Sequence, residues 1–411
     1  MAISKVGIRN FKGISEQNNI TIRPLTFFIG PNSSGKSSCI HALACLSQTL
    51  KIPNNTKHLV LDDEYANVHL GRFIDVIHSK SYQDEIELSI ELNDTSIYEP
   101  ENSGTTYSGA LRAEYTFKST MRTQETSLIK AIITIGSLRF ELIRKGVNYT
   151  LKEFSSGKSL DNIALTNITN VEITAFSKDY IYLYILFNQI NNIISSEIRK
   201  VLYLGPFRQQ PLRAYPTYSS SPNEVGALGE ATVTILANET IKSHTREHSI
   251  QINRWLNMMG LGKTIDVSRI ERSQYFNVLI ELEQSKKFAL ADLGYGLSQV
   301  LPVLTQCSFA EKNTTLLFEQ PELHLHSIAA RGLAEVFAEC INNKNLQIVA
   351  ETHSPDLLQA VQGLLRNGKL KYEDVIAYKV RRINGSTSIT PINIDHEDYD
   401  IWDDWEDGLT R

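Results

Sequence analysis

Cysteine is scarce in this sequence of 411 residues, which contains only four. None of the four stands in a C-x-x-C pair, the spacing that marks many zinc and redox sites. The composition therefore excludes a disulfide scaffold, and the cysteine pattern indicates no metal centre. Because a reduced cysteine behaves as a small apolar side chain, we predict buried thiols at Cys39, Cys45, Cys307 and Cys340.

Long apolar runs are also missing. The first residues, MAISKVGIRNFKGI, contain no apolar core of signal-peptide length. No stretch approaches the roughly 20 apolar residues that a membrane-spanning helix needs. We therefore expect a cytoplasmic protein without a membrane partner. No heptad pattern continues over several heptads, so long coiled-coil arms are not expected either.

Positive charge is not in excess. The chain has 41 Lys and Arg residues against 46 Asp and Glu, for a formal net charge of -5. A protein that coats nucleic acid indiscriminately has to neutralise many phosphates, so this class is disfavoured. A local basic groove stays open, and with it nucleic acid as a partner.

The chain changes its pattern near residue 85. Between Glu85 and about Glu153, the runs EIELSIEL, ALRAEYTF, IKAIITIG and LRFELI alternate apolar and polar residues and are separated by polar turns. They predict an antiparallel β subdomain. The stretch from Tyr180 to Val201 has apolar residues at helical spacing and predicts a helix. Ile3 to Phe11 predicts an edge strand.

Residues Gly30 to Ser37 read GPNSSGKS, which fits the phosphate-loop pattern G-x-x-x-x-G-K-[ST]. The motif follows a short apolar run, Leu25 to Ile29, and opens a helix predicted from Lys36 to about Leu50. Glycines let successive N–H groups face a β-phosphate, and the helix N-terminus adds a positive dipole end. We expect Lys36 to reach the β- and γ-phosphates and Ser37 to hold Mg²⁺. The predicted ATP-binding residues are Gly30, Pro31, Asn32, Ser33, Ser34, Gly35, Lys36, Ser37 and Ser38.

A second apolar run ends in carboxylates, in LLFEQPELHLH from Leu316 to His326. Glu319 at its end is placed to hold Mg²⁺, directly or through water. A further apolar run, LQIVAE, leads into Glu351-Thr352-His353-Ser354, where His353 is placed to contact a γ-phosphate or the attacking water. The alternative for His353 is a core or surface histidine that caps a turn.

The motifs GPNSSGKS, FEQPELHLH and ETHS, in this order, resemble the ABC-type ATPases of the overcoming-lysogenization-defect (OLD-like) group. That group is related to RecF-like and structural-maintenance-of-chromosomes (SMC) heads. The resemblance extends from Ile3 to about Tyr378 and implies an α/β ABC-ATPase head, a mixed sheet with flanking helices, that carries an antiparallel β-rich insertion. It implies the two halves of the head at 1–65 and 201–380, the insertion with its connecting helix at 66–200, and an acidic tail at 381–411.

The stretch Asp292 to Gln299, DLGYGLSQ, stands where these ATPases carry their signature motif. The family pattern implies that Gly296, Leu297 and Ser298 cap a helix that contacts the γ-phosphate bound by a second subunit. ATP would then be sandwiched in a homodimer or a higher oligomer.

The sequence leaves two interpretations open at each of two further places. Arg208 either points at phosphate or forms a surface ion pair, and the segment Asn10, Phe11 and Lys12 either borders the adenine or belongs to the core.

One residue departs from the family pattern. Most ABC-type heads carry a catalytic glutamate directly after the acid that positions Mg²⁺, and this chain has Gln320 there. An amide cannot accept the proton of the attacking water, and a positioned base contributes about 10² to 10⁴ in rate. We therefore expect slow hydrolysis, with Gln320, Glu322 and His353 as the candidate catalytic set.

Finer features are similar to a bacterial subgroup of these ATPases that ends in a short domain of unknown function. They are NVHLGRFIDVIH, YLGPFR and the closing IDHEDYDIWDDWEDG. Some relatives are ATPase subunits of Septu-type antiphage systems, which act with a separate nuclease. The resemblance implies a nucleotide-gated switch that controls a separate effector. A RecF-like DNA repair ATPase is the alternative, and a transporter ATPase is disfavoured by the divergent signature.

Overall fold

The computed structural model describes residues 3–52, 58–99, 105–122, 124–173, 181–216, 222–242, 245–271, 273–282, 286–392 and 394. The chain divides into two compact units. Unit 1 contains residues 1–22, 32–201 and 380–389, and unit 2 contains residues 23–31, 202–379 and 390–411. Most of the acidic tail, including Trp402 and Trp405, lies outside the described residues.

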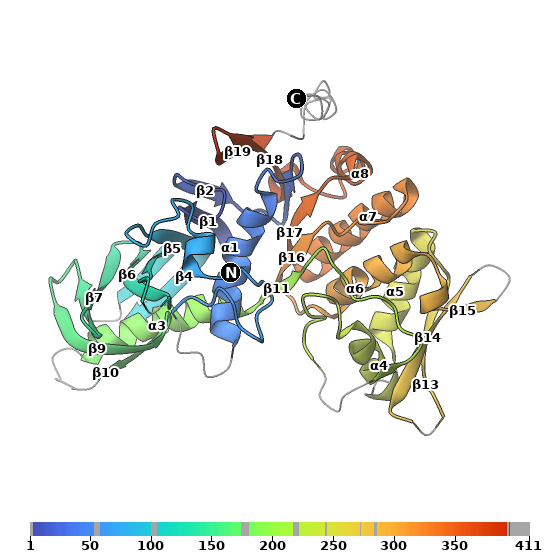
Figure 1. The fold of residues 1–411 in the computed structure, drawn as a ribbon, viewed down its shortest axis with the longest axis horizontal. Coiled ribbons are helices and arrows are strands. Elements are labelled where there is room, and N and C mark those ends of the chain that lie inside the picture. Colours follow the sequence, from blue (N-terminus) through green and yellow to red (C-terminus); the bar gives the residue numbers. More distant parts are fainter. Residues whose placement is uncertain are drawn as a thin grey trace. The chain divides into compact units, whose positions relative to one another are not determined.

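Unit 1 is built on an antiparallel sheet (Figure 1). Among the described residues, nine strands pair in the order β10-β9-β8-β7-β6-β5-β4-β1-β2. They are β1 (Ile3–Arg9), β2 (Asn18–Thr21), β4 (Ile86–Glu99), β5 (Thr105–Lys118), β6 (Ser127–Ile135), β7 (Leu138–Lys145), β8 (Asn148–Glu153), β9 (Ser159–Asn167) and β10 (Asn170–Ile173). The period-two runs of the sequence form β4 to β7, so the predicted β-rich insertion is confirmed.

The sequence predicts that the first strand lies at the edge of a sheet, and this prediction is wrong. β1 pairs with β2 on one side and with β4 on the other. The sequence pattern cannot show this pairing, because β4 follows β1 only after more than 70 residues. The strands of the insertion therefore continue the sheet that β1 and β2 begin.

The helices of unit 1 are α1 (Lys36–Lys51), the short α2 (Phe73–Val76) and α3 (Ile181–Arg199). α3 has 19 residues and is the longest helix in the described part of the chain, which therefore contains no long coiled-coil arm. Its buried residues recur at helical spacing, and the Phe187 ring lies 5.5 Å from that of Phe140 in the sheet. The buried residues on this stripe are Leu183, Leu186, Phe187, Ile190, Ile194 and Ile198.

Unit 2 is mixed α/β. Its main sheet has the order β11-β16-β17-β3-β18-β19, with β16, β17, β3 and β18 running parallel. These strands are β3 (Leu25–Ile29), β11 (Val201–Leu204), β16 (Thr315–Glu319), β17 (Gln347–Thr352), β18 (Val375–Ile383) and β19 (Ser386–Ile392). Residues 380–389, around the turn between β18 and β19, are grouped with unit 1.

A smaller antiparallel sheet and several helices complete unit 2 (Figure 1). The sheet consists of β12 (Tyr215–Pro216), β13 (Thr264–Arg269), β14 (Tyr275–Glu281) and β15 (Lys287–Ala289). The helices are α4 (Thr232–Lys242), α5 (Glu247–Met258), α6 (Tyr295–Phe309), α7 (Ser327–Lys344) and α8 (Pro355–Arg366). None of the helices in the described residues is long and apolar enough to span a bilayer.

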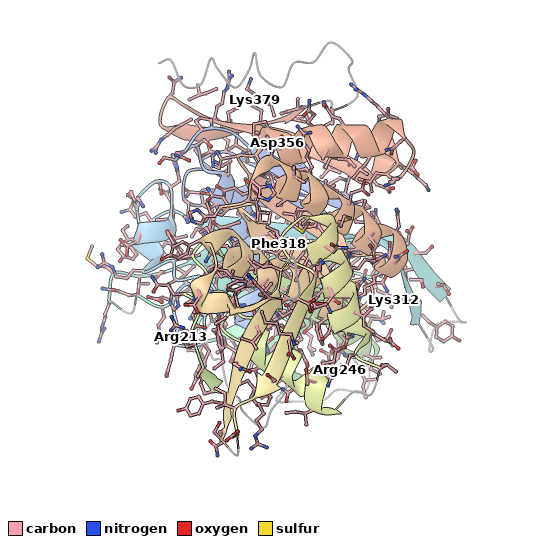
Figure 2. All side chains as sticks on the ribbon, turned by 90° about the vertical axis from the view of Figure 1, so that its right-hand side faces the viewer. Arg213, Arg246, Lys312, Phe318, Asp356 and Lys379 are labelled. Atoms are coloured by element: carbon pink, nitrogen blue, oxygen red, sulfur yellow. The ribbon has the colours of Figure 1, made fainter. Side chains whose placement is uncertain are left out.

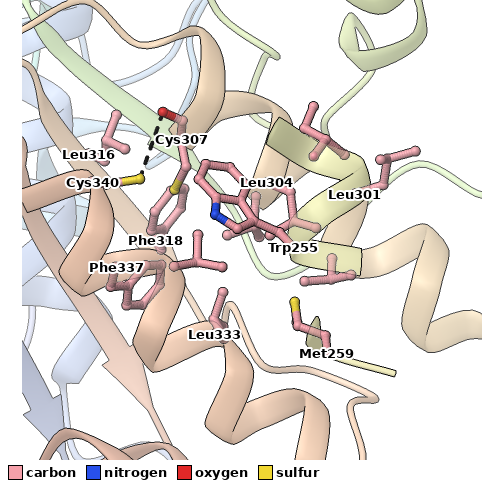
Figure 3. Packing of buried hydrophobic residues seen from close by; sticks show 14 of the residues in the cluster. Trp255, Met259, Leu301, Leu304, Cys307, Leu316, Phe318, Leu333, Phe337 and Cys340 are labelled. Atoms are coloured by element: carbon pink, nitrogen blue, oxygen red, sulfur yellow. Dashed lines mark hydrogen bonds between the residues drawn. The ribbon is translucent and has the colours of Figure 1, made fainter. Parts of the chain in front are cut away.

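The core of unit 2 gathers between the parallel sheet and α5, α6 and α7. Phe318 of β16 lies inside it, whereas the labelled Arg213, Arg246 and Lys312 are exposed (Figure 2). Figure 3 shows Trp255 packed among aliphatic residues, and the stacked rings of Phe318 and Phe337 with centroids 5.9 Å apart. Burial of each such side chain contributes roughly 1.5–3 kcal/mol.

The cysteine prediction is confirmed. All four cysteines are buried, and none forms a disulfide. Burial raises the pKa of the Cys45 thiol and of the Cys307 thiol, which keeps both protonated and unreactive at neutral pH.

Candidate active site

Three neighbouring parallel strands of unit 2 end at the same edge of the sheet. Glu319, the last residue of β16, lies opposite Glu351 of β17, and Thr352 lies opposite Ile29, the last residue of β3. All three strands are buried along their whole length, as continuous apolar runs are in a sheet covered on both faces. The phosphate loop begins at Gly30, so its first residues and the acidic strand ends share one edge.

The remainder of the phosphate loop belongs to unit 1. Asn32 and Ser33 are exposed, whereas Lys36 is 3% exposed. Ser33 and Gly35 both have left-handed backbone, with φ of 61° and 106°. Such alternation turns successive N–H groups to one side and forms an anion-binding concavity. α1 begins directly after Gly35, and its open N-terminus adds a positive dipole end.

Two side chains near the end of β11 hold the end of β16. The Tyr203 hydroxyl donates to Glu319 Oε1 at 2.6 Å. The terminal nitrogens of Arg208 donate to the main-chain oxygens of Glu319 and Gln320, each at 2.9 Å. Burial, with the Glu319 carboxylate beside it, raises the pKa of Tyr203, so this hydroxyl stays a hydrogen-bond donor.

The structure contradicts one of the two sequence-based interpretations of Arg208, the surface ion pair. It is 7% exposed, so it forms no surface ion pair, and its terminal nitrogens bind main-chain carbonyls. Burial lowers its pKa to about 10, which leaves the guanidinium charged at neutral pH. Arg208 therefore fixes the turn after β16. The sequence showed YLGPFR as a subgroup pattern, but no local signal indicates that Tyr203 and Arg208 reach residues more than 100 positions away.

Gln320 lies directly after Glu319, at the start of this turn. Its backbone is left-handed, with φ of 46°, a conformation that costs energy for residues other than glycine. Hydrogen bonds hold it there: the Gln320 N–H donates to Glu351 O at 2.9 Å, and Gln320 O accepts from Leu323 N–H at 3.1 Å. The turn thus keeps a fixed geometry relative to β17.

Glu322 and His353, both predicted from the sequence, are brought together. Glu322 Oε1 accepts hydrogen bonds from the Thr352 hydroxyl at 2.7 Å and from the His353 N–H at 2.9 Å. Its second oxygen, Oε2, has no hydrogen-bond partner among the described residues. Burial raises the pKa of Glu322. A carboxylate whose pKa is raised and whose second oxygen has no hydrogen-bond partner is suited to accept a proton.

His353 is neither a core residue nor a helix cap. Its side chain is 26% exposed, and its Nε2 lies 3.8 Å from Glu351 Oε1. The adjacent Ser354 caps α8 instead, by accepting a hydrogen bond from the Leu357 N–H at 3.2 Å. The cap of α8 is therefore Ser354 and not His353.

The signature segment forms the first turn of α6, but its cap is Gly294. Gly296, Leu297 and Ser298, expected as caps, lie inside the helix. Ser298 is 6% exposed, and its hydroxyl donates to Tyr295 O at 2.8 Å. A Cβ atom at Gly296 would lie 2.6 Å from His324 O, in the turn after β16. The signature helix therefore packs closely on the turn that carries Gln320 and Glu322.

This close approach predicts different effects for two neighbouring glycines. Gly296→Ala is expected to push α6 away from His324 and to cost about 1–3 kcal/mol of folding stability, as overpacking does. Gly294→Ala is the matched control, because a Cβ there meets no atom within 4 Å. Thermal unfolding of the two variants measures the difference. Equal melting temperatures would contradict this packing.

For the segment Asn10 to Lys12, in unit 1, the structure decides between the two interpretations at Phe11. Phe11 is fully buried and pairs with Ile14 and Ile77, so its ring belongs to the core and is not available to stack on adenine. Lys12 Nζ lies 2.7 Å from His41 Nδ1 of α1.

The residues present fit a divalent cation of the Mg²⁺ type. Mg²⁺ prefers oxygen ligands and uses one or two carboxylates together with phosphates and water. Glu319 supplies a buried carboxylate, oriented through one oxygen by Tyr203. Glu322 and Glu351 add buried carboxylates at the same edge, which favours a cation there.

Comparison with solved structures shows a related fold. The chain is similar to an SMC head bound to the C-winged helix domain of ScpA, with 12% identity, a TM-score of 0.52, and coverage of 96% of this chain and 98% of that chain. It also matches the SMC head domain from Thermotoga maritima, with 12% identity, a TM-score of 0.42, and coverage of 95% and 99%. The first of these matches, with its TM-score above 0.5, confirms the predicted α/β head fold.

Among curated proteins, no significant match is found. The family comparison does find one: the AAA ATPase domain family matches residues 1–358. This match spans most of the sequence and includes the phosphate loop, Glu319, Glu322 and His353. The chain therefore belongs to the AAA ATPase domain family.

Proposed function

We propose that this ATPase binds ATP at the phosphate loop, hydrolyses it slowly, and acts as a nucleotide-gated dimeric switch. In this proposal it works in the cytoplasm and controls a separate effector, such as a nuclease, in bacterial antiphage defence. The observation that carries the ATPase site is the shared edge where β3 leads into the phosphate loop beside Glu319, Glu351 and Thr352. The motif resemblance to Septu-type ATPase subunits supports the defence role.

Each site residue has a defined task in this proposal. Lys36 binds the β- and γ-phosphates, while Ser37 and Glu319 hold Mg²⁺. When bound, this ion would neutralise phosphate charge. Tyr203 and Arg208 fix the side chain and the main chain of Glu319. His353 contacts the γ-phosphate or the attacking water.

Proton transfer is the step for which the chain lacks the usual group. Gln320 orients the attacking water but cannot take its proton. Glu322 Oε2 is the acceptor in our proposal, because it is unpartnered and burial raises the pKa of this carboxyl. Since Oε1 is engaged by Thr352 and His353, the carboxylate has little freedom to move, which is consistent with slow turnover.

In this proposal, the change between the open chain and the closed dimer is the switch. The exposed N-terminal residue of α6, Tyr295, is 61% exposed, and the family pattern assigns this end of the helix to the partner's nucleotide. ATP that binds the closed dimer more tightly than the open chain shifts the population toward the dimer. Hydrolysis reverses the shift.

The insertion favours a protein target over nucleic acid. On its sheet, three basic residues pair with glutamates: Arg9 with Glu87 at 2.6 Å, Arg112 with Glu114 at 2.8 Å, and Lys130 with Glu141 at 2.7 Å. Cations that are already neutralised contribute little to phosphate binding. The SMC head described above is bound to a domain of another protein, which supports a head of this fold acting with a separate partner.

Light scattering tests the switch. We expect the purified chain with Mg²⁺ to double its mass with ATP but not with ADP, and Lys36→Ala to keep the nucleotide-free mass throughout. The same mass with ATP, with ADP and without nucleotide would contradict the proposed switch. Saturable, salt-dependent binding of duplex DNA by the ATP-bound dimer would favour the RecF-like alternative.

A further inference from the structure

A hairpin near the end of the chain lies against the phosphate loop. β18 and β19 are joined by Asn384 and Gly385, which have φ of 50° and 83°, the left-handed pair that a tight two-residue hairpin turn requires. The first residues of β19 are Ser386 and Thr387, and Thr387 is only 6% exposed. These residues belong to unit 1, as does the phosphate loop from Asn32 onward.

Thr387 joins two loops. Its N–H donates to Gly13 O at 2.7 Å, and its hydroxyl donates to Ser34 O, in the phosphate loop, at 3.0 Å. Beside it, the hydroxyls of Ser386 and Ser15 are 2.6 Å apart. The hairpin is therefore hydrogen-bonded both to the segment after β1 and to the phosphate loop.

The two glycines next to Thr387 leave the space that its hydroxyl occupies. A Cβ atom at Gly35 would lie 2.2 Å from Thr387 Oγ1, and one at Gly13 would lie 2.4 Å from the same atom. Both distances are too short for real atoms. Gly35 thus serves two purposes: it adopts φ of 106°, and it admits the hydroxyl of Thr387.

The hydrogen bond to Ser34 O has a direct consequence for the loop. The peptide between Ser34 and Gly35 is planar and trans, so its C=O and its N–H point in opposite directions. When Thr387 holds the Ser34 carbonyl on one side, the Gly35 N–H is directed to the other side. Backbone N–H groups of this loop are the donors that cradle phosphate in the motif.

We infer that Thr387 is a positioning residue for phosphate binding: it fixes the Ser34–Gly35 peptide so that the Gly35 N–H faces the bound phosphates. The inference rests on the proposed nucleotide site. It gives the β18–β19 hairpin a role in setting the affinity for ATP, without contact between Thr387 and the nucleotide.

The test uses three variants of the full chain. Thr387→Val keeps the β-branched shape and removes the donor, whereas Thr387→Ser keeps the hydroxyl. Thr390→Val removes an exposed hydroxyl from the same strand and serves as the control. For each, the ATP·Mg²⁺ dissociation constant, KM, kcat and the melting temperature of the nucleotide-free protein are measured.

We expect Thr387→Val to raise the dissociation constant and KM for ATP about 3- to 10-fold, the loss typical of one hydrogen bond. Its melting temperature should fall, because the buried Ser34 carbonyl loses its donor, whereas its kcat should stay close to that of the unaltered chain. Thr387→Ser and Thr390→Val should bind within about twofold of it, because each retains the Ser34 hydrogen bond. A purely structural role would instead lower the melting temperature and kcat together.

Unchanged ATP affinity in Thr387→Val would overturn the inference, and so would a loss of affinity that Thr387→Ser shares. Lys36→Ala separates this failure from failure of the proposed site. If Lys36→Ala loses ATP binding while Thr387→Val does not, only the role of Thr387 is wrong. If Lys36→Ala also binds ATP normally, the proposed nucleotide site is itself wrong.

Discussion

Lys36→Ala is expected to abolish ATP turnover and to weaken ATP binding at least about 100-fold. Lys36 is the first residue of α1 and is 3% exposed, so its ammonium group acts where solvent screens little. Removing one partner of a buried charge pair costs about 3–5 kcal/mol, and each 1.4 kcal/mol is a factor of ten. Equilibrium titration with ATP·Mg²⁺ and a phosphate-release assay measure both effects.

Lys51→Ala is the matched control. Lys51 is the last residue of the same helix, and its Nζ donates to Val201 O at 2.7 Å. Its removal takes the same charge from the opposite end of α1 and is expected to leave ATP affinity within about twofold, because that end is about 20 Å from the loop. Equal loss in both variants would show that Lys36 acts through the stability of α1.

Glu322→Gln is expected to lower kcat about 10² to 10⁴-fold while ATP still binds. The amide can accept the hydrogen bonds of Thr352 and His353, but it cannot take a proton from water. Because burial raises the pKa of Glu322, replacing it by a neutral isostere removes a desolvation cost, and the melting temperature should not fall. Single-turnover hydrolysis and thermal unfolding of the variant check these points.

Two further variants distinguish the candidate bases. Gln320→Ala should reduce kcat less than Glu322→Gln, because it removes an orienting group and leaves the proton acceptor. His353→Ala should affect KM as well as kcat, since His353 is proposed to contact the γ-phosphate. If Glu322→Gln turns over normally and His353→Ala does not, the assignment of the base to Glu322 is wrong.

The sequence predicts the elements around the phosphate loop well. β3 spans the expected Leu25–Ile29, and α1 begins at the expected Lys36. Both are local features: a continuous apolar run fits a buried parallel strand, and the glycine before Lys36 takes the left-handed conformation at the helix N-cap. β16 and β17 are predicted for the same reason.

The contacts that hold the site together could not be predicted. Tyr203 and Glu319 are 116 residues apart, and Thr387 and Ser34 are separated by 353, so no local pattern links them. The sequence places residues 386–392 in the predicted acidic tail, whereas in the structure they form β19. The Asn-Gly turn at 384–385 was the available signal for this strand. Pairing across the sheet, which places β1 in the interior, likewise depends on tertiary structure.

ATP binding and hydrolysis by the purified chain, measured with Mg²⁺ and again with the metal chelated, test the nucleotide site directly. We expect saturable ATP binding and slow release of phosphate with Mg²⁺, and loss of hydrolysis on chelation. Absence of saturable ATP binding under both conditions would contradict the proposal that the phosphate loop and the acidic strand ends form a nucleotide site.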